Sequence, residues 1–268
     1  MTAIALNGAT GRMGRTIASL LVDDPRFQLK AAITHRESKA LGRDIGLLAG
    51  TTELGIPATT ISYETLRDTD VVIDFSVPDA TTALLDYCTA QHLGLVTGTT
   101  GFNDKQLNLI EHAAKEVPIL VAPNMSIGVN VAFNLVEQAT RMLDADVDIE
   151  VYEAHHRNKL DAPSGTAKRM GEIITSTLAQ NRSDIATTEP AEPTDPKHIE
   201  FHSARGGDVV GEHTVTFFGK GERLEITHRA SSRTNFAVGA LQGAAFIGKK
   251  LDEGSVGTYC MSEVLGLR

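Results

Sequence analysis

The chain lacks tryptophan and contains few residues of several types that mark particular classes of protein. Only two cysteines, Cys88 and Cys260, occur in 268 residues, so a disulfide-stabilised scaffold is not expected and a reducing compartment is. No apolar run approaches the roughly 20 residues needed to span a bilayer. The formal net charge of -9 argues against general nucleic-acid binding, because such proteins carry basic surfaces.

The N-terminus has no basic segment followed by an apolar region and a cleavage site. Together with the scarcity of cysteine, this predicts a cytoplasmic protein that binds neither membrane nor nucleic acid. Hydrophobic residues make up 41% and charged residues 22% of the sequence, which is ordinary for a globular protein. A chain of this length suggests two domains or one large one.

A glycine-rich turn follows the first apolar stretch of the chain. Residues 3–6 predict a strand, residues 16–22 predict a helix, and between them Gly8, Gly11 and Gly14 have the spacing G-x-x-G-x-x-G. A strand, a glycine turn and a helix are the first half of a dinucleotide-binding βαβ unit, where a Cβ would keep the backbone away from the pyrophosphate. Three glycines in a turn are also found where no cofactor binds. The prediction of a dinucleotide site therefore rests on the position of these glycines in the first βα turn of the chain.

Strands and helices continue to alternate over about 125 residues. Predicted strands 29–33, 70–75, 94–97 and 119–122 alternate with helices 80–92 and 104–115, which favours a doubly wound parallel sheet. Two loops follow strand ends, where such sheets bind ligands: 98–102, of small residues, and the turn at Pro123-Asn124. Either loop is also compatible with ordinary turn chemistry.

The second half of the chain has a different pattern. Helix 129–143 and strand 148–152 come first, and residues 180–197 predict a polar excursion with little regular structure. Stretches 199–205, 209–218 and 223–229 predict strands that glycine turns join as hairpins. A helix over 235–251, rich in glycine and alanine, ends the pattern. We therefore expect an α+β domain after the parallel sheet.

The stretch EAHHRNKLDAPSGTA, residues 153–167, gathers basic side chains in an acidic protein. His155, His156, Arg157 and Lys159 fall within five residues, a costly arrangement unless an anion binds there. Ser164 fits the N-cap of a following helix, whose first amides form an anion site. The alternatives are a basic loop before a capped surface helix, or a metal site at the histidine pair. Arg157 and Lys159 would repel a cation, so no metal is expected.

These motifs together resemble the 4-hydroxy-tetrahydrodipicolinate reductase (dihydrodipicolinate reductase) family. The resemblance rests on GxxGRMG, GTTGF, EAHHRxKxDAPSGTA, GDxVGEHTV and ERLEITHRASSR, and it covers essentially the whole chain. It implies an α/β protein: an N-terminal Rossmann-type doubly wound sheet in residues 1–126, to which 234–268 return, and a C-terminal α+β domain of open mixed sheet in 127–233. It also implies that this second domain binds substrate and assembles a homotetramer.

The resemblance further implies an activity, the reduction of 4-hydroxy-tetrahydrodipicolinate by NADPH or NADH in lysine and diaminopimelate biosynthesis. His155 matches the family's acid/base and Lys159 its proton donor. Lys159 also belongs to the predicted substrate-binding set, with His156, Ser164, Gly165 and Thr166. The predicted cofactor-binding set is Gly8, Ala9, Thr10, Gly11, Arg12, Met13, Thr34, His35, Arg36, Gly98, Thr99, Thr100, Ala122, Pro123, Asn124 and Met125.

Two departures from the family pattern affect these assignments. Thr34 and His35 stand where an acidic residue and an arginine are common, and an acid there would favour NADH by repelling the phosphate of NADPH. With Thr34 uncharged and Arg36 nearby, we expect NADPH to be used at least as well as NADH. Val77 replaces a basic residue near the nicotinamide, whose role is then unfilled or supplied by Arg233.

The sequence also predicts an oligomer, and it leaves two other functions possible. Apolar residues such as Val215, Phe217 and Phe218 fall on both alternations of the later strands, which predicts that sheets of different subunits pack together. One rival is a different nicotinamide-dependent dehydrogenase of a small anionic carbonyl compound. The other is a cofactor-sensing protein without turnover, which would have no use for His155 and Lys159.

Overall fold

In the computed structural model the described residues, 1–143, 147–178 and 199–267, form two compact units. The N-terminal unit comprises Met1–Ile127 with Thr234–Arg268, and the central unit comprises Gly128–Arg233. The predicted polar excursion at 180–197 lies outside the described residues. None of the helices in the described part has the length and apolarity to cross a bilayer.

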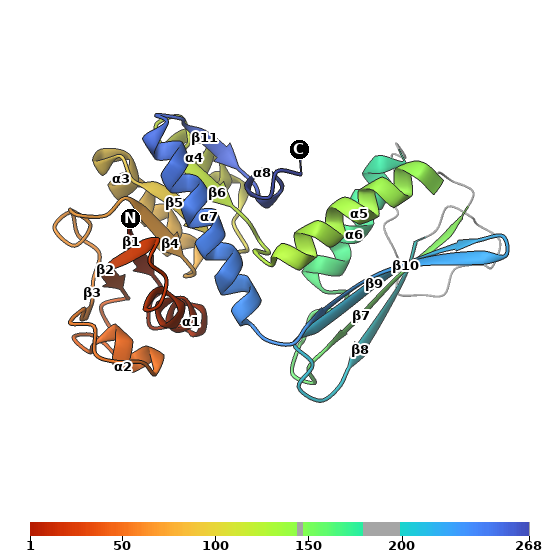
Figure 1. Cartoon of the computed structure of the whole chain (residues 1–268), viewed down its shortest axis with the longest axis horizontal. Helices are drawn as coiled ribbons and strands as arrows, with labels where there is room; N and C mark the ends of the chain where they lie inside the picture. Colours follow the sequence, from red (N-terminus) through yellow and green to blue (C-terminus); the bar gives the residue numbers. More distant parts are fainter. Residues whose placement is uncertain (144–146, 179–198, 268) are drawn as a thin grey trace. The chain divides into compact units, whose positions relative to one another are not determined.

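The N-terminal unit is built on one seven-stranded sheet in which all strands are parallel (Figure 1). In spatial order its strands are β3 (Ala58–Thr59), β2 (Phe27–Ile33), β1 (Thr2–Asn7), β4 (Val71–Asp74), β5 (Gly94–Thr97), β6 (Pro118–Val121) and β11 (Gly257–Tyr259). The order reverses between β1 and β4, and ligands bind beyond the carboxyl ends of strands at such a switch point.

Both faces of this sheet are covered, which explains the continuous apolar runs of its strands. Every residue of β4 and β5 is buried, and separate apolar clusters occupy the two faces. The helices of the unit are α1 (Arg12–Leu21), α2 (Ile45–Ala49), α3 (Pro78–Gln91), α4 (Asp104–Ala113), α7 (Thr234–Asp252) and α8 (Met261–Val264). The predicted doubly wound parallel sheet is confirmed.

Several element boundaries differ from the sequence predictions. Helix α1 begins at Arg12, four residues earlier than expected, because Gly14 packs against the carbonyls of Gly8 and Ala9 inside the first helical turn. Elements α2, β3, β11 and α8 were not predicted. Each has five residues or fewer, too short for a hydrophobic period to be visible.

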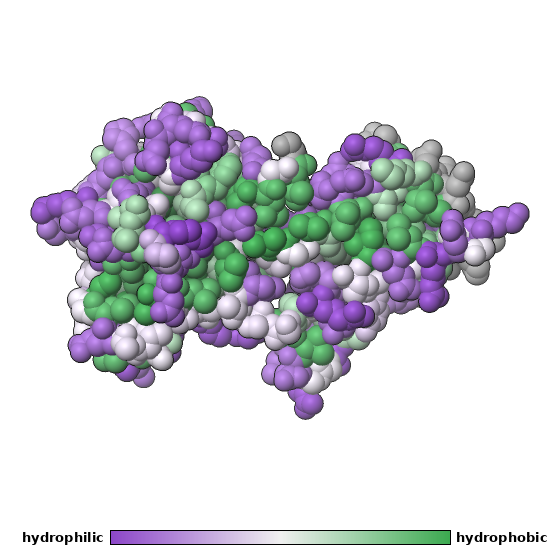
Figure 2. Space-filling view, viewed as in Figure 1, coloured by the Kyte–Doolittle hydropathy of each residue, from purple (hydrophilic) through white to green (hydrophobic). Residues whose placement is uncertain are grey.

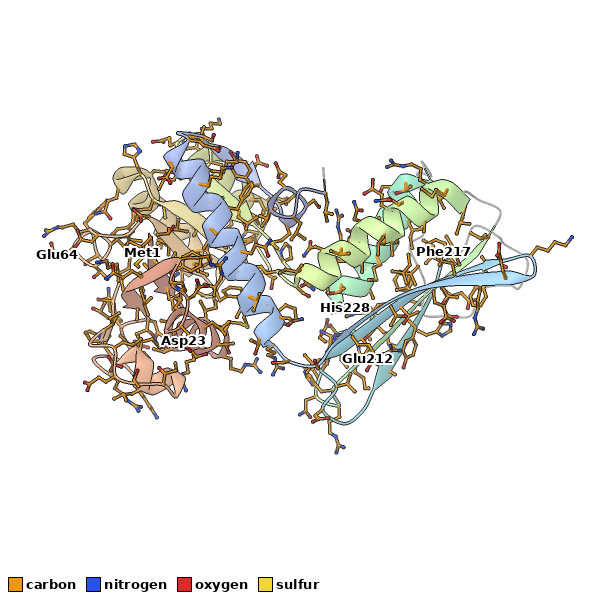
Figure 3. All side chains as sticks on the ribbon, viewed as in Figure 1. Met1, Asp23, Glu64, Glu212, Phe217 and His228 are labelled. Carbon is orange, nitrogen blue, oxygen red and sulfur yellow. The ribbon has the colours of Figure 1, made fainter. Side chains whose placement is uncertain are left out.

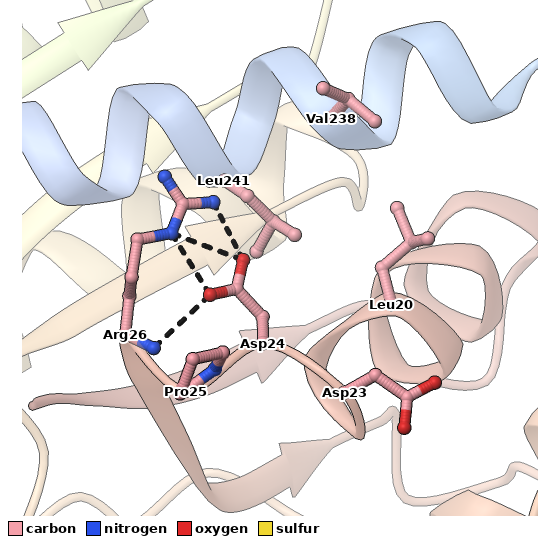
Figure 4. Close-up of a pocket in the computed structure, with 7 residues that line it drawn as sticks. All are labelled: Leu20, Asp23, Asp24, Pro25, Arg26, Val238 and Leu241. Atoms are coloured by element: carbon pink, nitrogen blue, oxygen red, sulfur yellow. Dashed lines mark hydrogen bonds and ion pairs between the residues drawn. The ribbon is translucent and has the colours of Figure 1, made fainter.

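Helix α7 returns the chain to the N-terminal unit and packs on α1 and the sheet. Figure 4 shows Leu241 and Val238 of α7 across a shallow pocket from Leu20 of α1. The loop that ends the pocket is held by an ion pair of Asp24 with Arg26, 2.6 Å long. Strand β11 then adds to the edge of the sheet beside β6.

The central unit is a four-stranded mixed sheet with two helices on one face. Its elements are α5 (Ile127–Leu143), β7 (Asp148–His155), α6 (Gly165–Thr177), β8 (Ile199–Arg205), β9 (Gly211–Gly219) and β10 (Glu222–Ala230). The side of the sheet that carries α5 and α6 holds the core, which includes Phe217, labelled in Figure 3. The predicted open mixed sheet is confirmed.

One predicted hairpin of this sheet is wrong. Strands β9 and β10 form an antiparallel pair as expected, but β8 and β9 do not pair, because β7 lies between them. The loop after β8 crosses the end of β7, where the Gly206 amide donates to the His155 carbonyl at 3.0 Å. Strand β7 is therefore an interior strand of the sheet, an order that differs from the order along the sequence.

Candidate active site

The predicted cofactor-binding residues Gly8 to Met13 lie between β1 and the first turn of α1. Gly8 has φ +75°, and a Cβ there would lie 2.4 Å from the Phe75 carbonyl oxygen, so only glycine fits. Gly11 is the N-cap of α1, and no side chain caps the helix. The first-turn amides of α1 are therefore available for an anion such as a pyrophosphate.

The predicted ribose-reading residues follow β2. Thr34 is buried, and its Oγ1 lies 2.8 Å from Oγ1 of Thr10 in the glycine turn. Since one hydroxyl of this pair donates to the other, a single hydroxyl proton remains for an outside acceptor. His35 and Arg36 are exposed. The structure thus brings Thr34 to the glycine turn and presents Arg36 to solvent.

The other two predicted cofactor segments follow β5 and β6. Gly98 packs against the Phe75 ring, Thr99 is buried and Thr100 is exposed. In the segment after β6, Ala122 and Met125 have buried side chains, Pro123 is exposed, and the Asn124 carboxamide oxygen accepts from the Ser126 amide at 2.9 Å. Met125 belongs to the core, so only its backbone is suited to contact a cofactor.

The two residues named for the nicotinamide role have separate positions. Val77 is exposed and is the N-cap of α3 in the N-terminal unit. Arg233 is exposed and is the last residue of the central unit. Val77 carries no charge to replace the missing base, so Arg233 remains the prediction for this role.

A polar cluster occupies the end of the helix-covered face of the central unit. On β7 the alternation Ile149, Val151, Glu153, His155 is buried throughout, so the inward positions change from apolar to ionisable toward the carboxyl end. The register places His213 of β9 opposite Glu153 and Arg205 of β8 opposite His155. A slip of one residue would turn all these side chains to the other face.

Glu153 is the centre of this cluster. Its carboxylate is fully buried and receives Arg205 through two bonds of 2.7 and 2.9 Å, and its Oε2 lies 2.5 Å from His155 Nδ1. Burial alone would raise the pKa of Glu153, but hydrogen bonds from Arg205, Ser203 and His155 lower it. Glu153 is therefore an anion that orients both partners.

His155 has one ring nitrogen engaged and the other directed to a small residue. Nδ1 donates to Glu153, and Nε2 lies 3.0 Å from where a Cβ of Gly211 would be. Burial lowers the pKa of His155, opposed by Glu153 and assisted by the charges of Lys159 and Arg205. A neutral ring with Nε2 unprotonated follows, which makes His155 a base or hydrogen-bond acceptor at neutral pH.

Lys159 lies in the loop between β7 and α6. Its Nζ forms an ion pair of 2.7 Å with Asp161, and the carbonyl of Asp161 accepts from Arg205 at 2.6 Å. Lys159 keeps 21% of its side chain exposed. In the same loop His156 is partly buried and Arg157 is exposed. Arg205 thus fastens the loop of Lys159 to the anion that orients His155.

The N-terminus of α6 follows, with Ser164 as its N-cap as predicted. Ser164 Oγ accepts from the Ala167 amide at 3.2 Å and lies 2.9 Å from His213 Nε2. Since the hydroxyl is buried and engaged, any contact of Ser164 with a substrate would be through its backbone. The amides of Gly165 and Thr166 begin the helix, and both residues are at least partly accessible, so an anion can reach them.

Four residues of the site had no role assigned from the sequence: Glu153, Asp161, Arg205 and His213. An available signal was the charge of Glu153 on the buried alternation of a strand, which requires a partner. Arg205 and His213 were assigned to strands, and the structure shows His213 to be buried. Only the β8–β7–β9 register, which the sequence did not predict, brings these residues to Glu153.

His213 should make stability depend on pH. Burial, with a smaller effect of the charge of His155, lowers the pKa of His213 from 6.5 to about 4. As the pH falls below 6.5, His213 becomes protonated in the unfolded chain but stays neutral in the folded chain until about pH 4. The free energy of unfolding should therefore fall by up to about 3 kcal/mol as the pH is lowered across this interval. Urea unfolding at several pH values measures it. His213→Gln should reduce the slope, and equal slopes would contradict the assignment.

Known proteins are similar to this chain over almost its whole length. The description "Dihydrodipicolinate reductase, N-terminus" matches residues 2–125, and "Dihydrodipicolinate reductase, C-terminus" matches residues 128–265. Relatives named 4-hydroxy-tetrahydrodipicolinate reductase include one from Acinetobacter baumannii (strain AYE), 46% identical over 98% of this chain and 96% of the relative. Another, from Nitrosomonas eutropha, is 46% identical over 99% and 98%.

A solved structure agrees with the architecture. The dipicolinate-bound dihydrodipicolinate reductase from Paenisporosarcina sp. TG-14 has a TM-score of 0.74 and 24% identity, with 98% of both chains covered. At this identity the similarity establishes the fold, while the family is established by the two matched descriptions and the full-length relatives. This chain belongs to the dihydrodipicolinate reductase family.

Proposed function

We propose that the protein reduces 4-hydroxy-tetrahydrodipicolinate to tetrahydrodipicolinate with NADPH or NADH, releasing water. The observation that carries this proposal is the oriented Glu153–His155 pair next to the Lys159 loop and the Ser164-capped N-terminus of α6. The names of the full-length relatives support it. The reaction belongs to diaminopimelate and lysine biosynthesis, which we place in the cytoplasm.

The N-terminal unit fits a nicotinamide dinucleotide. Gly11 leaves α1 without a side-chain cap, and its own Cβ position meets only the Gly8 carbonyl, at 3.2 Å. The pyrophosphate would lie against the first-turn amides of α1, with the ribose near Thr10 and Thr34. The bound cofactor supplies the hydride, and the protein must orient the substrate, exclude competing reactions and deliver a proton.

Lys159 is the better proton donor of the two predicted catalytic residues. The lowered pKa of His155 leaves its Nε2 without a proton at neutral pH, whereas an ammonium group carries three donors. His155 is suited to accept a hydrogen bond from the substrate. Asp161 holds the ammonium group in place before the substrate binds.

The carboxylates of the substrate have complementary partners in the central unit. The amides of Gly165 and Thr166 at the α6 N-terminus would bind one carboxylate. Lys159 and His156 would contact the substrate from the preceding loop. A dicarboxylate is the ligand in the related structure from Paenisporosarcina sp. TG-14, which supports this assignment.

A continuous assay tests the proposal. Substrate made freshly by the preceding synthase is added to enzyme and reduced cofactor, and the fall in cofactor absorbance is followed. We expect turnover with this substrate and none with other small anionic carbonyl compounds. Turnover of another such compound would indicate a different dehydrogenase. Cofactor binding without any turnover would indicate a sensor.

Cofactor choice should follow from the end of β2. Thr34 is uncharged and Arg36 is exposed beside it, so the residue at the end of β2 does not repel the extra phosphate of NADPH and a guanidinium can bind it. We expect kcat/KM with NADPH to equal or exceed that with NADH, and Arg36→Ala to weaken NADPH binding about tenfold while leaving NADH binding unchanged. Steady-state kinetics in low-salt buffer with both cofactors measures this. A clear preference of the wild type for NADH would contradict it.

We also propose a homotetramer in which the uncovered faces of the central sheets pack together. Val215 and Phe217 face the helices, so the uncovered face has fewer apolar residues than the sequence suggested, chiefly Tyr152 and Phe218. Figure 2 shows a second apolar surface over α5, where Val131, Leu135 and Met142 are exposed.

Sedimentation at micromolar concentration tests the assembly. We expect four times the mass of the chain, and Phe218→Asp should lower it because the buried carboxylate would have no partner. Arg169→Asp, on the exposed side of α6, serves as the control and should leave the mass unchanged. A monomeric wild type would contradict the proposal.

A further inference from the structure

A buried carboxylate at the switch point of the N-terminal sheet has no role in the function proposed above. Asp74 is the last residue of β4 and its side chain is fully buried. The register places it beside Asn7, the last residue of β1, and Thr97, the last residue of β5. Open α/β sheets bind their ligands beyond these strand ends.

Five side chains donate hydrogen bonds to this carboxylate. Oδ1 accepts from Asn7 Nδ2 at 2.8 Å and from Ser76 Oγ at 2.5 Å. Oδ2 accepts from three hydroxyls at 2.6, 2.8 and 2.9 Å, those of Thr81, Thr97 and Thr99. The bonds come from amide and hydroxyl groups, and the buried charge is dispersed over neutral donors.

Backbone amides fix the direction of two of these hydroxyls. Thr97 Oγ1 accepts from the Thr99 amide at 3.2 Å, and Thr99 Oγ1 accepts from the Ser76 amide at 3.1 Å. Each hydroxyl is therefore an acceptor from the backbone and a donor to Asp74. A carboxylate has about four lone-pair sites, so five donors saturate it and none is left for a ligand.

The partners of Asp74 lie at the ends of β1 and β5, in the segments after β4 and β5, and, for Thr81, in α3, so they connect the three loops that follow β1, β4 and β5. Asn7 precedes the glycine turn, Ser76 lies between β4 and α3, and Thr97 and Thr99 flank Gly98. We propose that Asp74 is a positioning residue of the dinucleotide site, whose carboxylate locks these three loops in one arrangement before the cofactor binds. The inference rests on the proposed function, because that function assigns the first and third loops to the cofactor.

The charge and the two acceptor oxygens are both needed for this role. Asp74→Asn keeps the shape of the side chain but replaces one oxygen by an NH2 group, which is a donor. In either orientation of the amide, at least two of the five donors lose their acceptor and face another donor. The loops then lose their common anchor, and ordering them would cost binding free energy.

The test compares Asp74→Asn with Asp70→Asn in the full-length protein. Asp70 immediately precedes β4, at the opposite end of the strand from Asp74, where it accepts from the Ala3 amide at 2.7 Å. NADPH affinity is measured by fluorescence titration, and amide exchange by mass spectrometry on peptides from the three loops. We expect Asp74→Asn to bind NADPH at least about tenfold more weakly, equivalent to about 1.4 kcal/mol. Exchange should become faster in all three loops, KM for the dicarboxylate should stay unchanged, and Asp70→Asn should show neither effect.

Thr97→Val provides a milder variant in case Asp74→Asn does not fold. It keeps the shape, removes one donor to Asp74 and one acceptor for the Thr99 amide, and should weaken NADPH binding about threefold. A folded Asp74→Asn protein with wild-type NADPH affinity would overturn the proposal, as would a Thr97→Val protein with wild-type affinity if only that variant folds.

The proposed function can fail separately. Neither the titration nor the exchange measurement depends on turnover, so a wild type that binds NADPH without reducing the substrate would contradict the function and leave the comparison at Asp74 decisive. A wild type that binds no nicotinamide dinucleotide would overturn both.

Discussion

Lys159→Met should reduce kcat by at least about a hundredfold, the range that a positioned proton donor contributes. The methionine keeps the length of the side chain and removes the ammonium group that pairs with Asp161. Affinity for NADPH should stay within about twofold, because Lys159 belongs to the central unit and the predicted cofactor loops to the N-terminal unit. Steady-state kinetics and a cofactor titration measure the two quantities.

Two comparisons make this result specific. Lys168→Met changes an exposed lysine of α6 and should leave kcat unchanged. His155→Gln should be less severe than Lys159→Met, since His155 accepts a hydrogen bond at neutral pH and does not hold the proton to be delivered. Loss of cofactor binding by Lys159→Met, with turnover of the bound complex intact, would show that the role is wrong.

Glu153→Gln should destabilise the protein by about 3 kcal/mol and lower kcat more than tenfold. Removing one charge of a buried pair leaves the other without compensation, and Arg205 makes two bonds to this carboxylate. With its oxygen in the place of Oε2 the amide can still accept from His155, but its NH2 group then faces Arg205 Nη2, so one of the two bonds to Arg205 is lost. Urea unfolding and steady-state kinetics measure the two effects.

The control for Glu153→Gln is Glu172→Gln. Glu172 pairs with Arg169 on the exposed surface of α6, and exposed pairs contribute about 0–1 kcal/mol. This variant should behave as the wild type. If Glu153→Gln were equally stable and active, Glu153 would have no part in orienting His155, and the cluster on β7 would be structurally and catalytically unimportant.

The N-terminal sheet was largely predictable because its signals are local. Residues 94–97 were predicted as a strand and β5 has these bounds, since a buried parallel strand is a short apolar run between turn residues. Strands β3 and β11 were not predicted, because a strand of two or three residues is too short to show an alternation of apolar and polar residues. Each of them forms only by pairing with the strand at one edge of the sheet, β2 for β3 and β6 for β11.

The site was predictable only in part, for a related reason. His155, Lys159 and Ser164 lie within one stretch, and their spacing and chemistry pointed to an anion. Arg205 and His213 come from strands about 50 residues farther along. Their proximity to Glu153 depends on the β8–β7–β9 order, and the sequence favoured a simple hairpin instead. A charged residue on a buried alternation predicts that a partner exists but does not identify it.

The most direct test of the proposed function follows the hydride itself. Reduced cofactor carrying deuterium at the transferred position is mixed with the enzyme and freshly made 4-hydroxy-tetrahydrodipicolinate, and the product is analysed by mass spectrometry. We predict tetrahydrodipicolinate with a single deuterium, formed as fast as the cofactor is oxidised, and almost none with Lys159→Met. Oxidation of the cofactor without deuterium in the product, or no oxidation at all, would contradict the proposed function.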